Sequence, residues 1–259
     1  MSFGRLFTSL GIDNVITVFE CLLLENRLVF VSKSLGTLSE CVNASIAILN
    51  PLSWQYVFIP VLPDSLLSYC CAPMPFIVGI LHASLAEVNS MPTEELLIID
   101  CDKGKLIKKP PNSSFLSEEM RNYLKDCLSR IQASCDMTDK YFDLHVARCF
   151  VNLMYRLFGN YYKFFSSKHV FDQETFLESQ PPQYQSVCIS FLFFSCSSSP
   201  SFTTDLLNFI VTLFLLPFCF LQSSSTAYAS FLFPHPASNY HSFPSFDELV
   251  NSRHDVFRM

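Results

Sequence analysis

The sequence predicts an α/β fold: a three-layer lobe with a central, mainly parallel sheet flanked by helices and finished by C-terminal helices. Several short runs are apolar throughout, which is typical of strands that are buried on both faces. Segments with apolar residues three and four positions apart alternate with these runs, as expected for helices placed between parallel strands. After Pro110 and Pro111 the pattern becomes helical.

Four apolar runs in the first hundred residues predict strands. They are residues 28–31, 56–63, 76–80 and 95–100. The polar turn at 100–105 leads from the last run into Leu106 and Ile107, so these two segments are expected to pair as a hairpin.

Helices are predicted where apolar residues recur at helical spacing. The ranges are 12–24, 34–49, 66–71 as a short helical turn, 118–131 and 139–157. Short polar side chains that accept a hydrogen bond from a free backbone N–H favour helix starts. On this basis the candidate N-caps are Asp13 or Asn14 for the first helix, Thr37 or Ser39 for the second, and Ser117 for the fourth.

Composition argues against several classes of protein. The net charge of −6 gives no electrostatic attraction toward nucleic acid, so no nucleic-acid partner is predicted. The 11 cysteines include no C-x-x-C pair, which indicates free thiols in a reducing cytosol. A secretory signal is not expected, because Asp13, Asn14 and Glu20 interrupt the apolar residues near the N-terminus.

Motifs for bond-breaking chemistry or cofactor binding are not found. The sequence has no G-x-x-x-x-G-K-[ST], no G-x-G-x-x-G and no G-x-S-x-G. His145 and Cys149 lie four apart on a predicted helix, a spacing that can serve a metal, but no second pair accompanies them. We therefore predict no catalytic residues, no cofactor and no metal.

The end of the chain differs in composition from the rest. Between Lys168 and Arg253 there is no Lys or Arg, and Phe, Ser, Leu and Pro dominate. Residues 206–221 are nearly all apolar, yet fall short of the roughly twenty residues that span a bilayer. Three interpretations compete: a membrane anchor, a folded extension, or the translation of a pyrimidine-rich non-coding segment, which we favour. The expected division is a lobe over 1–184 and a low-complexity tail over 185–259.

Three motifs, taken in their order and spacing, resemble the central subdomain of the DENN domain family. They are Leu24-Glu-Asn-Arg-Leu-Val-Phe-Val-Ser32, Pro51-Leu-Ser-Trp-Gln-Tyr-Val-Phe-Ile-Pro-Val-Leu-Pro63 and Pro73-Met-Pro-Phe-Ile-Val-Gly79. The similarity covers roughly residues 10–185 and is strongest to the DENN-domain-containing protein 2 group. Structural roles in packing, turns and close backbone approach are expected for Trp54, Pro60, Pro63, Pro73, Pro75 and Gly79.

The resemblance implies a guanine-nucleotide exchange factor for Rab-family small GTPases. Such a factor distorts the switch regions of the GTPase and weakens its binding of nucleotide and Mg²⁺. The family's N-terminal longin-like lobe is expected to be missing here, so the chain would be a truncated form. The resemblance also implies a cytoplasmic protein recruited to vesicle or endomembrane surfaces. Two alternatives remain open: a non-catalytic module that binds a GTPase or another DENN protein, and a small membrane protein anchored by residues 206–221.

Partner-binding residues are predicted in two places. Asp13 and Asn14 are expected to face the GTPase or the other lobe, unless they only cap the first helix. The second place is the loop after the first strand, because α/β sheets put binding surfaces at the carboxyl ends of their strands. That loop consists of Lys33, Ser34, Leu35, Gly36 and Thr37.

Overall fold

The computed structural model describes residues 3–50, 52, 54–93, 95–158, 163–164, 172–182, 184–185 and 187–188. Within them, five strands form one sheet in the order β2-β3-β1-β4-β5. The first four strands are parallel and β5 runs antiparallel to β4, so the predicted mainly parallel sheet is confirmed. The strands are β1 (Arg27–Ser32), β2 (Val57–Ile59), β3 (Phe76–Leu81), β4 (Leu96–Asp100) and β5 (Lys105–Lys108).

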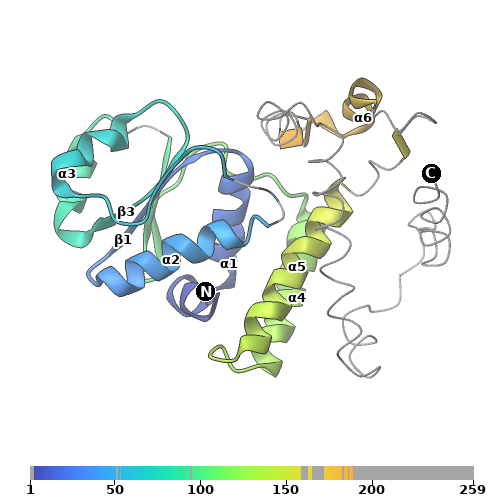
Figure 1. Ribbon diagram of the computed structural model, residues 1–259, viewed down its shortest axis with the longest axis horizontal. Helices are drawn as coiled ribbons and strands as arrows, with labels where there is room; N and C mark the ends of the chain where they lie inside the picture. Colours follow the sequence, from blue (N-terminus) through green and yellow to red (C-terminus); the bar gives the residue numbers. More distant parts are fainter. Residues whose placement is uncertain are drawn as a thin grey trace, which may run out of the picture. The chain divides into compact units, whose positions relative to one another are not determined.

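Helices cover both faces of this sheet, and further helices follow it in the chain (Figure 1). One face is covered by α1 (Phe3–Leu23) and α2 (Leu35–Ala47). The elements between β2 and β4 are η1 (Asp64–Cys71), η2 (His82–Ser84) and α3 (Leu85–Ser90), and η1 and α3 cover the other face. The elements after the sheet are α4 (Glu118–Ser134), α5 (Lys140–Phe158) and α6 (Gln173–Ser179).

Alternation along β1 produces these layers. Leu28 and Phe30 belong to the core that the sheet shares with α1, α2, α4 and α5. Val29 and Val31 belong to the core under η1 and α3. All four side chains are fully buried, which is why this strand is apolar throughout rather than alternating.

The first helix is longer than predicted and is divided. It begins at Phe3 rather than at residue 12, and Gly11 interrupts it with φ of 73° and ψ of 163°. Glycine reaches positive φ without the steric cost that a Cβ imposes. The turns before the break bury Leu6, Phe7 and Leu10 in the core. The sequence pattern missed this part because the helical register is not continuous across Gly11.

Several later elements confirm their predictions. Ser117 N-caps α4 and accepts a hydrogen bond from the Met120 N–H. The β4–β5 hairpin forms as expected. The second strand is shorter than the predicted 56–63, since Pro60 has no N–H to donate to a ladder. The short helix α3 was not predicted.

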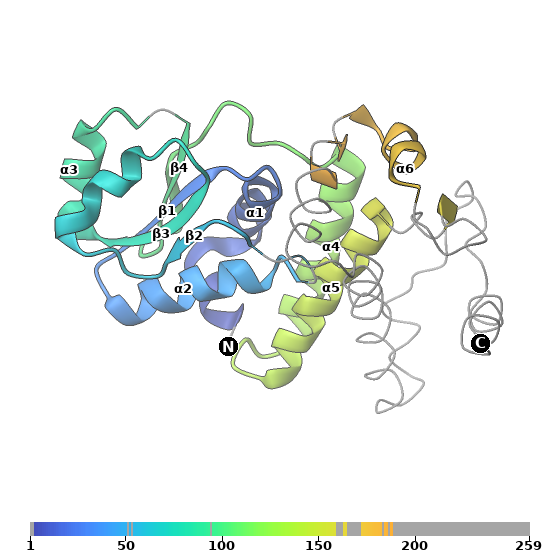
Figure 2. The ribbon, with the colours of Figure 1, turned by 45° about the horizontal axis from the view of Figure 1, so that its top comes forward.

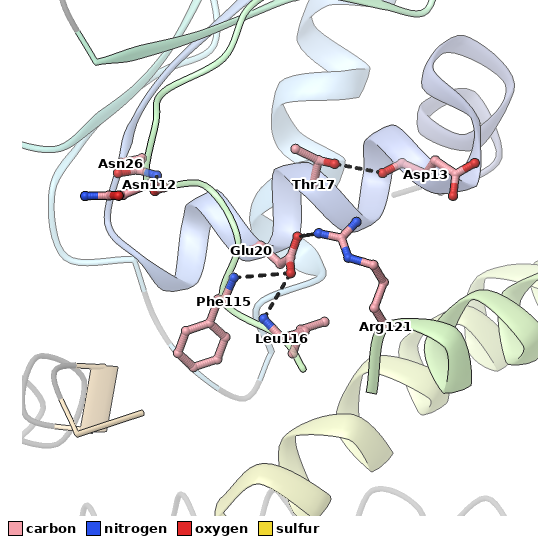
Figure 3. A network of polar contacts seen from close by, with 8 residues as sticks. All are labelled: Asp13, Thr17, Glu20, Asn26, Asn112, Phe115, Leu116 and Arg121. Atoms are coloured by element: carbon pink, nitrogen blue, oxygen red, sulfur yellow. Dashed lines mark hydrogen bonds and ion pairs between the residues drawn. The ribbon is translucent and has the colours of Figure 1, made fainter. Parts of the chain in front are cut away.

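A fully buried carboxylate joins α1 to α4 (Figure 3). Glu20 accepts hydrogen bonds from the backbone N–H groups of Phe115 and Leu116, at 3.2 and 3.0 Å. It also forms an ion pair with the guanidinium of Arg121 on α4. A carboxylate can be buried when its charge is paired and its oxygens accept hydrogen bonds, as here.

Among the described residues, α1 is long and apolar enough to cross a membrane by length and composition. In this fold it is a core helix, with its apolar residues packed against the sheet and the later helices. The predicted tail, apart from residues 185, 187 and 188, lies outside the described residues, and so does the apolar segment 206–221.

Candidate partner-binding edge

The carboxyl ends of β1 and β4 meet at one edge of the sheet, because these strands are neighbours and parallel. β1 ends at Ser32 and β4 at Asp100. The segments that follow them, together with the break in α1, form what we call the carboxyl edge, defined as residues 11–14, 32–37 and 100–104. Both predicted partner-binding segments fall within it.

The loop after β1 is exposed and leads directly into α2. Ser34 N-caps that helix, and its side chain accepts a hydrogen bond from the Thr37 N–H at 3.5 Å. The predictions of Thr37 or Ser39 as the cap are therefore wrong, because the helix starts earlier than the apolar pattern. Leu35 opens the helix with 54% of its surface exposed. Lys33 and Gly36 are exposed as well.

Asp102 ties this loop to the β4–β5 turn. One of its carboxylate oxygens accepts a hydrogen bond from the Ser32 hydroxyl and the other from the Lys33 N–H, both at 2.8 Å. Burial would raise the pKa of Asp102, but these two hydrogen bonds and the nearby charges of Lys33 and His82 lower it below its ordinary value. The loop backbone is thus fixed by a charged side chain from the neighbouring turn.

Asn14 ties the same turn to α1. Its side-chain amide donates to the carbonyl oxygens of Leu10 and Gly104, both at 2.9 Å. Asn14 therefore bridges the break in α1 to the turn and does not N-cap the helix, since a cap would accept from an N–H. Gly104 has φ of 60°, and a Cβ there would lie 2.6 Å from the Ser9 carbonyl oxygen. Only glycine allows so close an approach.

Asp13 points elsewhere. Its carboxylate forms an ion pair with Lys125 of α4 at 2.6 Å, and both side chains are largely exposed. The predicted N-cap role of Asp13 is replaced by this contact. The structure thus brings Asn14 and the loop at 33–37 to one turn, whereas Asp13 lies toward α4.

Asp102 is a member of this edge that the sequence pattern assigned only to a turn. A signal was present, since Asp102 follows a strand end in a parallel sheet, where binding residues gather.

Beneath the edge, the buried thiols of Cys41 and Cys101 lie close together, and Ser9 is also near Cys41. The hydrogen bond from Cys101 lowers the pKa of Cys41 despite its burial.

The motif residues lie around β2 and β3. The Trp54 indole N–H donates to the Val57 carbonyl at 3.3 Å, and the half-buried ring packs against the core. A Cβ on Gly79 would lie 2.1 Å from the Pro60 carbonyl oxygen, so the two backbones are in direct contact. Pro63 precedes η1, and Pro73 and Pro75 precede β3.

In the part of the chain that the structure describes, there is no group of three or more His, Cys, Asp or Glu placed to hold a metal ion. The Nδ1 atom of His145 is buried without a hydrogen-bond partner. Burial and the charge of Arg148 lower the pKa of His145. The Cys149 thiol contacts Cys127 of the neighbouring helix. Among the described residues, His145 and Cys149 therefore belong to no group of three or more possible metal ligands.

The exposed edge lies at the carboxyl ends of parallel strands in an α/β sheet, where such folds place binding surfaces. Residues 1–104 match the family model described as "DENN (AEX-3) domain". This match confirms the resemblance to the DENN domain family that the motifs show, and it covers the part of the chain up to Gly104.

Curated relatives agree with this assignment. Human DENN domain-containing protein 2B is 33% identical over 192 residues, which cover 69% of this chain and 17% of that protein. Mouse DENN domain-containing protein 2A is 32% identical over 180 residues, 64% of this chain and 18% of that protein. Human DENN domain-containing protein 2C is 43% identical over 109 residues, 42% of this chain and 12% of that protein. The chain thus spans less than a fifth of the length of each of these relatives.

Proposed function

We propose that this chain contributes the α/β part of a guanine-nucleotide exchange factor for a Rab-family small GTPase and contacts the GTPase through the carboxyl edge. The match of residues 1–104 to the DENN domain supports the type of activity. The geometry of the edge supports the location, because Asn14 and the loop at 33–37 both contact the turn at 100–104.

The main support for the proposal is the exposure of the Leu35 side chain at the carboxyl edge. More than half of this leucine is exposed, and it stands on a loop whose backbone is held by Ser34 and Asp102. A partner that buries an apolar side chain gains free energy from the area removed from water. Because the loop is already ordered, little conformational entropy is lost when the partner binds.

Exchange by such a module needs no covalent step. If the module binds the nucleotide-free GTPase more tightly than the GDP-bound form, it weakens GDP binding by the same factor, by thermodynamic linkage. The chain's own contribution is therefore a rigid contact surface. GDP and Mg²⁺ belong to the GTPase and are released from it.

The test compares two apolar residues of nearly equal exposure at different places. Leu35 is 54% exposed at the carboxyl edge, and Met74 is 52% exposed ahead of β3. Release of fluorescent GDP from a panel of Rab GTPases is measured with the wild-type chain, Leu35→Asp and Met74→Asp. Aspartate in the first turn of α2 suits the helix dipole, so Leu35→Asp should leave the fold intact. We expect Leu35→Asp to slow exchange about tenfold or more, as for the loss of an interface hot spot, and Met74→Asp to match the wild type.

Each outcome has a clear meaning. Faster GDP release that depends on Leu35 supports an exchange factor. Binding of a GTPase without faster release would favour the non-catalytic module. Equal loss in both variants, or no binding by the wild-type chain to any Rab, would refute the assignment to the carboxyl edge.

The proposal includes a cytoplasmic protein that associates peripherally with vesicle membranes. The proposal predicts that alkaline carbonate releases the full chain from isolated membranes. Retention in the membrane pellet would instead favour an anchor such as residues 206–221.

A further inference from the structure

A pair of contacting thiols lies between two helices that the proposed function does not use. The helices α4 and α5 pack side by side (Figure 2). Cys127 of α4 is half-buried, and Cys149 of α5 is buried. Each thiol shifts the pKa of the other, so the two side chains lie close together. The contact joins residues that are adjacent only because the two helices pack together.

The surroundings of Cys127 favour its thiolate. Cys149 hydrogen-bonds to Cys127, and the Tyr123 side chain hydrogen-bonds to it as well. The guanidinium of Arg156 lies 4.2 Å from the centre of the Tyr123 ring. Arg130 and Arg156 add positive charge from both helices.

These groups shift the pKa values of the two thiols in opposite directions. The hydrogen bond from Cys149, supported by Tyr123 and the two arginines, lowers the pKa of Cys127 to about 7 against the opposing effect of burial. The same hydrogen bond, with burial, raises the pKa of Cys149, and Arg148 opposes this weakly. The two effects together favour the thiolate at Cys127 over the thiolate at Cys149.

We propose that Cys127 is a site of oxidation by hydrogen peroxide, with Cys149 as the resolving thiol, so that the product is a disulfide between α4 and α5. A reactive cysteine of this kind is a thiolate that an oxidant can reach and that has a second thiol beside it. Cys127 meets these conditions through its partial exposure, its cationic neighbours and its contact with Cys149.

The reaction balances without any further reactant. The Cys127 thiolate attacks one oxygen of hydrogen peroxide, which breaks the O–O bond, forms a sulfenic acid and releases hydroxide. Cys149 then attacks the sulfenic sulfur, the S–S bond forms, and the sulfenic oxygen leaves as hydroxide. The Cys149 proton converts one hydroxide to water, and the proton that Cys127 released to the solvent on ionisation converts the other. Two electrons pass from the thiols to the peroxide.

Other cysteines of the described part of the chain provide internal comparisons. Cys41 and Cys101 also contact each other, but both are buried in the core, out of reach of an oxidant. Cys71 is exposed, and its sequence neighbour is the buried Cys70, whose pKa burial raises to about 11. Cys71 is therefore a control for exposure alone, and the Cys41–Cys101 pair is a control for a thiol pair that is not exposed.

The test is peptide mapping of the folded full chain after brief exposure to hydrogen peroxide near neutral pH. Trypsin cleavage after Lys125, Arg130, Arg148 and Arg156 releases peptides 126–130 and 149–156, each with a single cysteine. We expect these two peptides to be joined by a disulfide that dithiothreitol reverses. The same treatment of urea-unfolded chain should give no preference for this pair.

Variants separate the two roles. Cys149→Ala should trap the sulfenic acid on Cys127, detected by a dimedone adduct on peptide 126–130. Cys127→Ser should abolish both the adduct and the disulfide, and Cys71→Ser should change neither. Alkylation of Cys127 in the wild-type chain should be half-maximal near pH 7 rather than near the ordinary thiol value of about 8.5.

The proposal fails if the folded wild-type chain gives no 126–130 to 149–156 link, a result that needs no variant to fold. It also fails if Cys71 is oxidised before Cys127, or if the link forms as fast in the unfolded chain. None of these outcomes bears on GTPase binding, so the two proposals succeed or fail separately.

Discussion

Substitution of Glu20 by alanine should destabilise the protein more than any surface change. This carboxylate is fully buried and connects three groups that come from the segment before α4 and from α4 itself (Figure 3). Its oxygens accept from the Phe115 and Leu116 N–H groups and pair with Arg121. Alanine removes all three contacts at once.

The magnitude follows from what is left behind. The Phe115 and Leu116 residues are buried, so each backbone N–H without an acceptor costs about 1–3 kcal/mol. Arg121 retains 29% of its side-chain exposure and can still reach water. The lost ion pair therefore adds about 1 kcal/mol rather than the roughly 3–5 kcal/mol of a fully buried pair. The sum is about 3–7 kcal/mol, a large share of the roughly 5–15 kcal/mol that stabilises a typical protein.

Urea unfolding measures this loss, and the chain carries its own probe. Trp54 is the single tryptophan and is half-buried against the core, so its fluorescence reports on the α/β part. With an m-value of about 2 kcal/mol/M, a loss of about 4 kcal/mol moves the midpoint down by about 2 M. Circular dichroism of the same samples follows the helices.

Two variants serve as controls. Glu20→Gln keeps an oxygen that can accept from the backbone and should lose less than Glu20→Ala. Asp13→Ala removes the exposed α1–α4 ion pair with Lys125 and should cost less than about 1 kcal/mol. A loss below about 1 kcal/mol for Glu20→Ala would refute the argument, because it would mean that the two N–H groups find other acceptors.

Two further predictions concern the backbone contact in the sheet and the carboxyl edge. Gly79→Ala should destabilise by at least about 2 kcal/mol, since a Cβ would lie 2.1 Å from the Pro60 carbonyl oxygen. At Gly36 in α2 a Cβ would meet only the Ser34 hydroxyl oxygen, at an ordinary contact distance of 3.8 Å, so Gly36→Ala should be neutral or stabilising in the same urea assay. Equal effects of the two substitutions would contradict the close approach. The pKa of Asp102 is lowered in the folded chain, so its stabilisation is present above the unfolded value of about 3.9 and is lost as the pH falls through the folded pKa. The protection factor of the Lys33 amide, which is the intrinsic exchange rate divided by the observed rate, should decrease at pH values below that range. An unchanged protection factor would show that Asp102 does not hold the loop.

The sequence by itself determined the classes of element and their order. Buried parallel strands are apolar along their whole length, and helices that cover them repeat at three and four residues, so both are visible locally. Ser117 as a cap and the hairpin after Asp100 depend on neighbours a few residues away. The motifs from Leu24 to Gly79 also sufficed to indicate the family, because their order and spacing are themselves sequence properties.

The tertiary structure alone decided the contacts that define the sites. In the sequence, Glu20 is only a polar interruption of an apolar segment. The fold places Arg121 and the N–H groups of Phe115 and Leu116 around it. In the sequence, Asp102 is only part of a polar turn. The parallel pairing of β1 and β4 places it beside Lys33. The physical reason is the same in each case: a hydrogen bond or a thiol contact requires atoms a few ångströms apart. Which distant residues come that close is fixed by the path of the whole backbone, not by the pattern of any single segment.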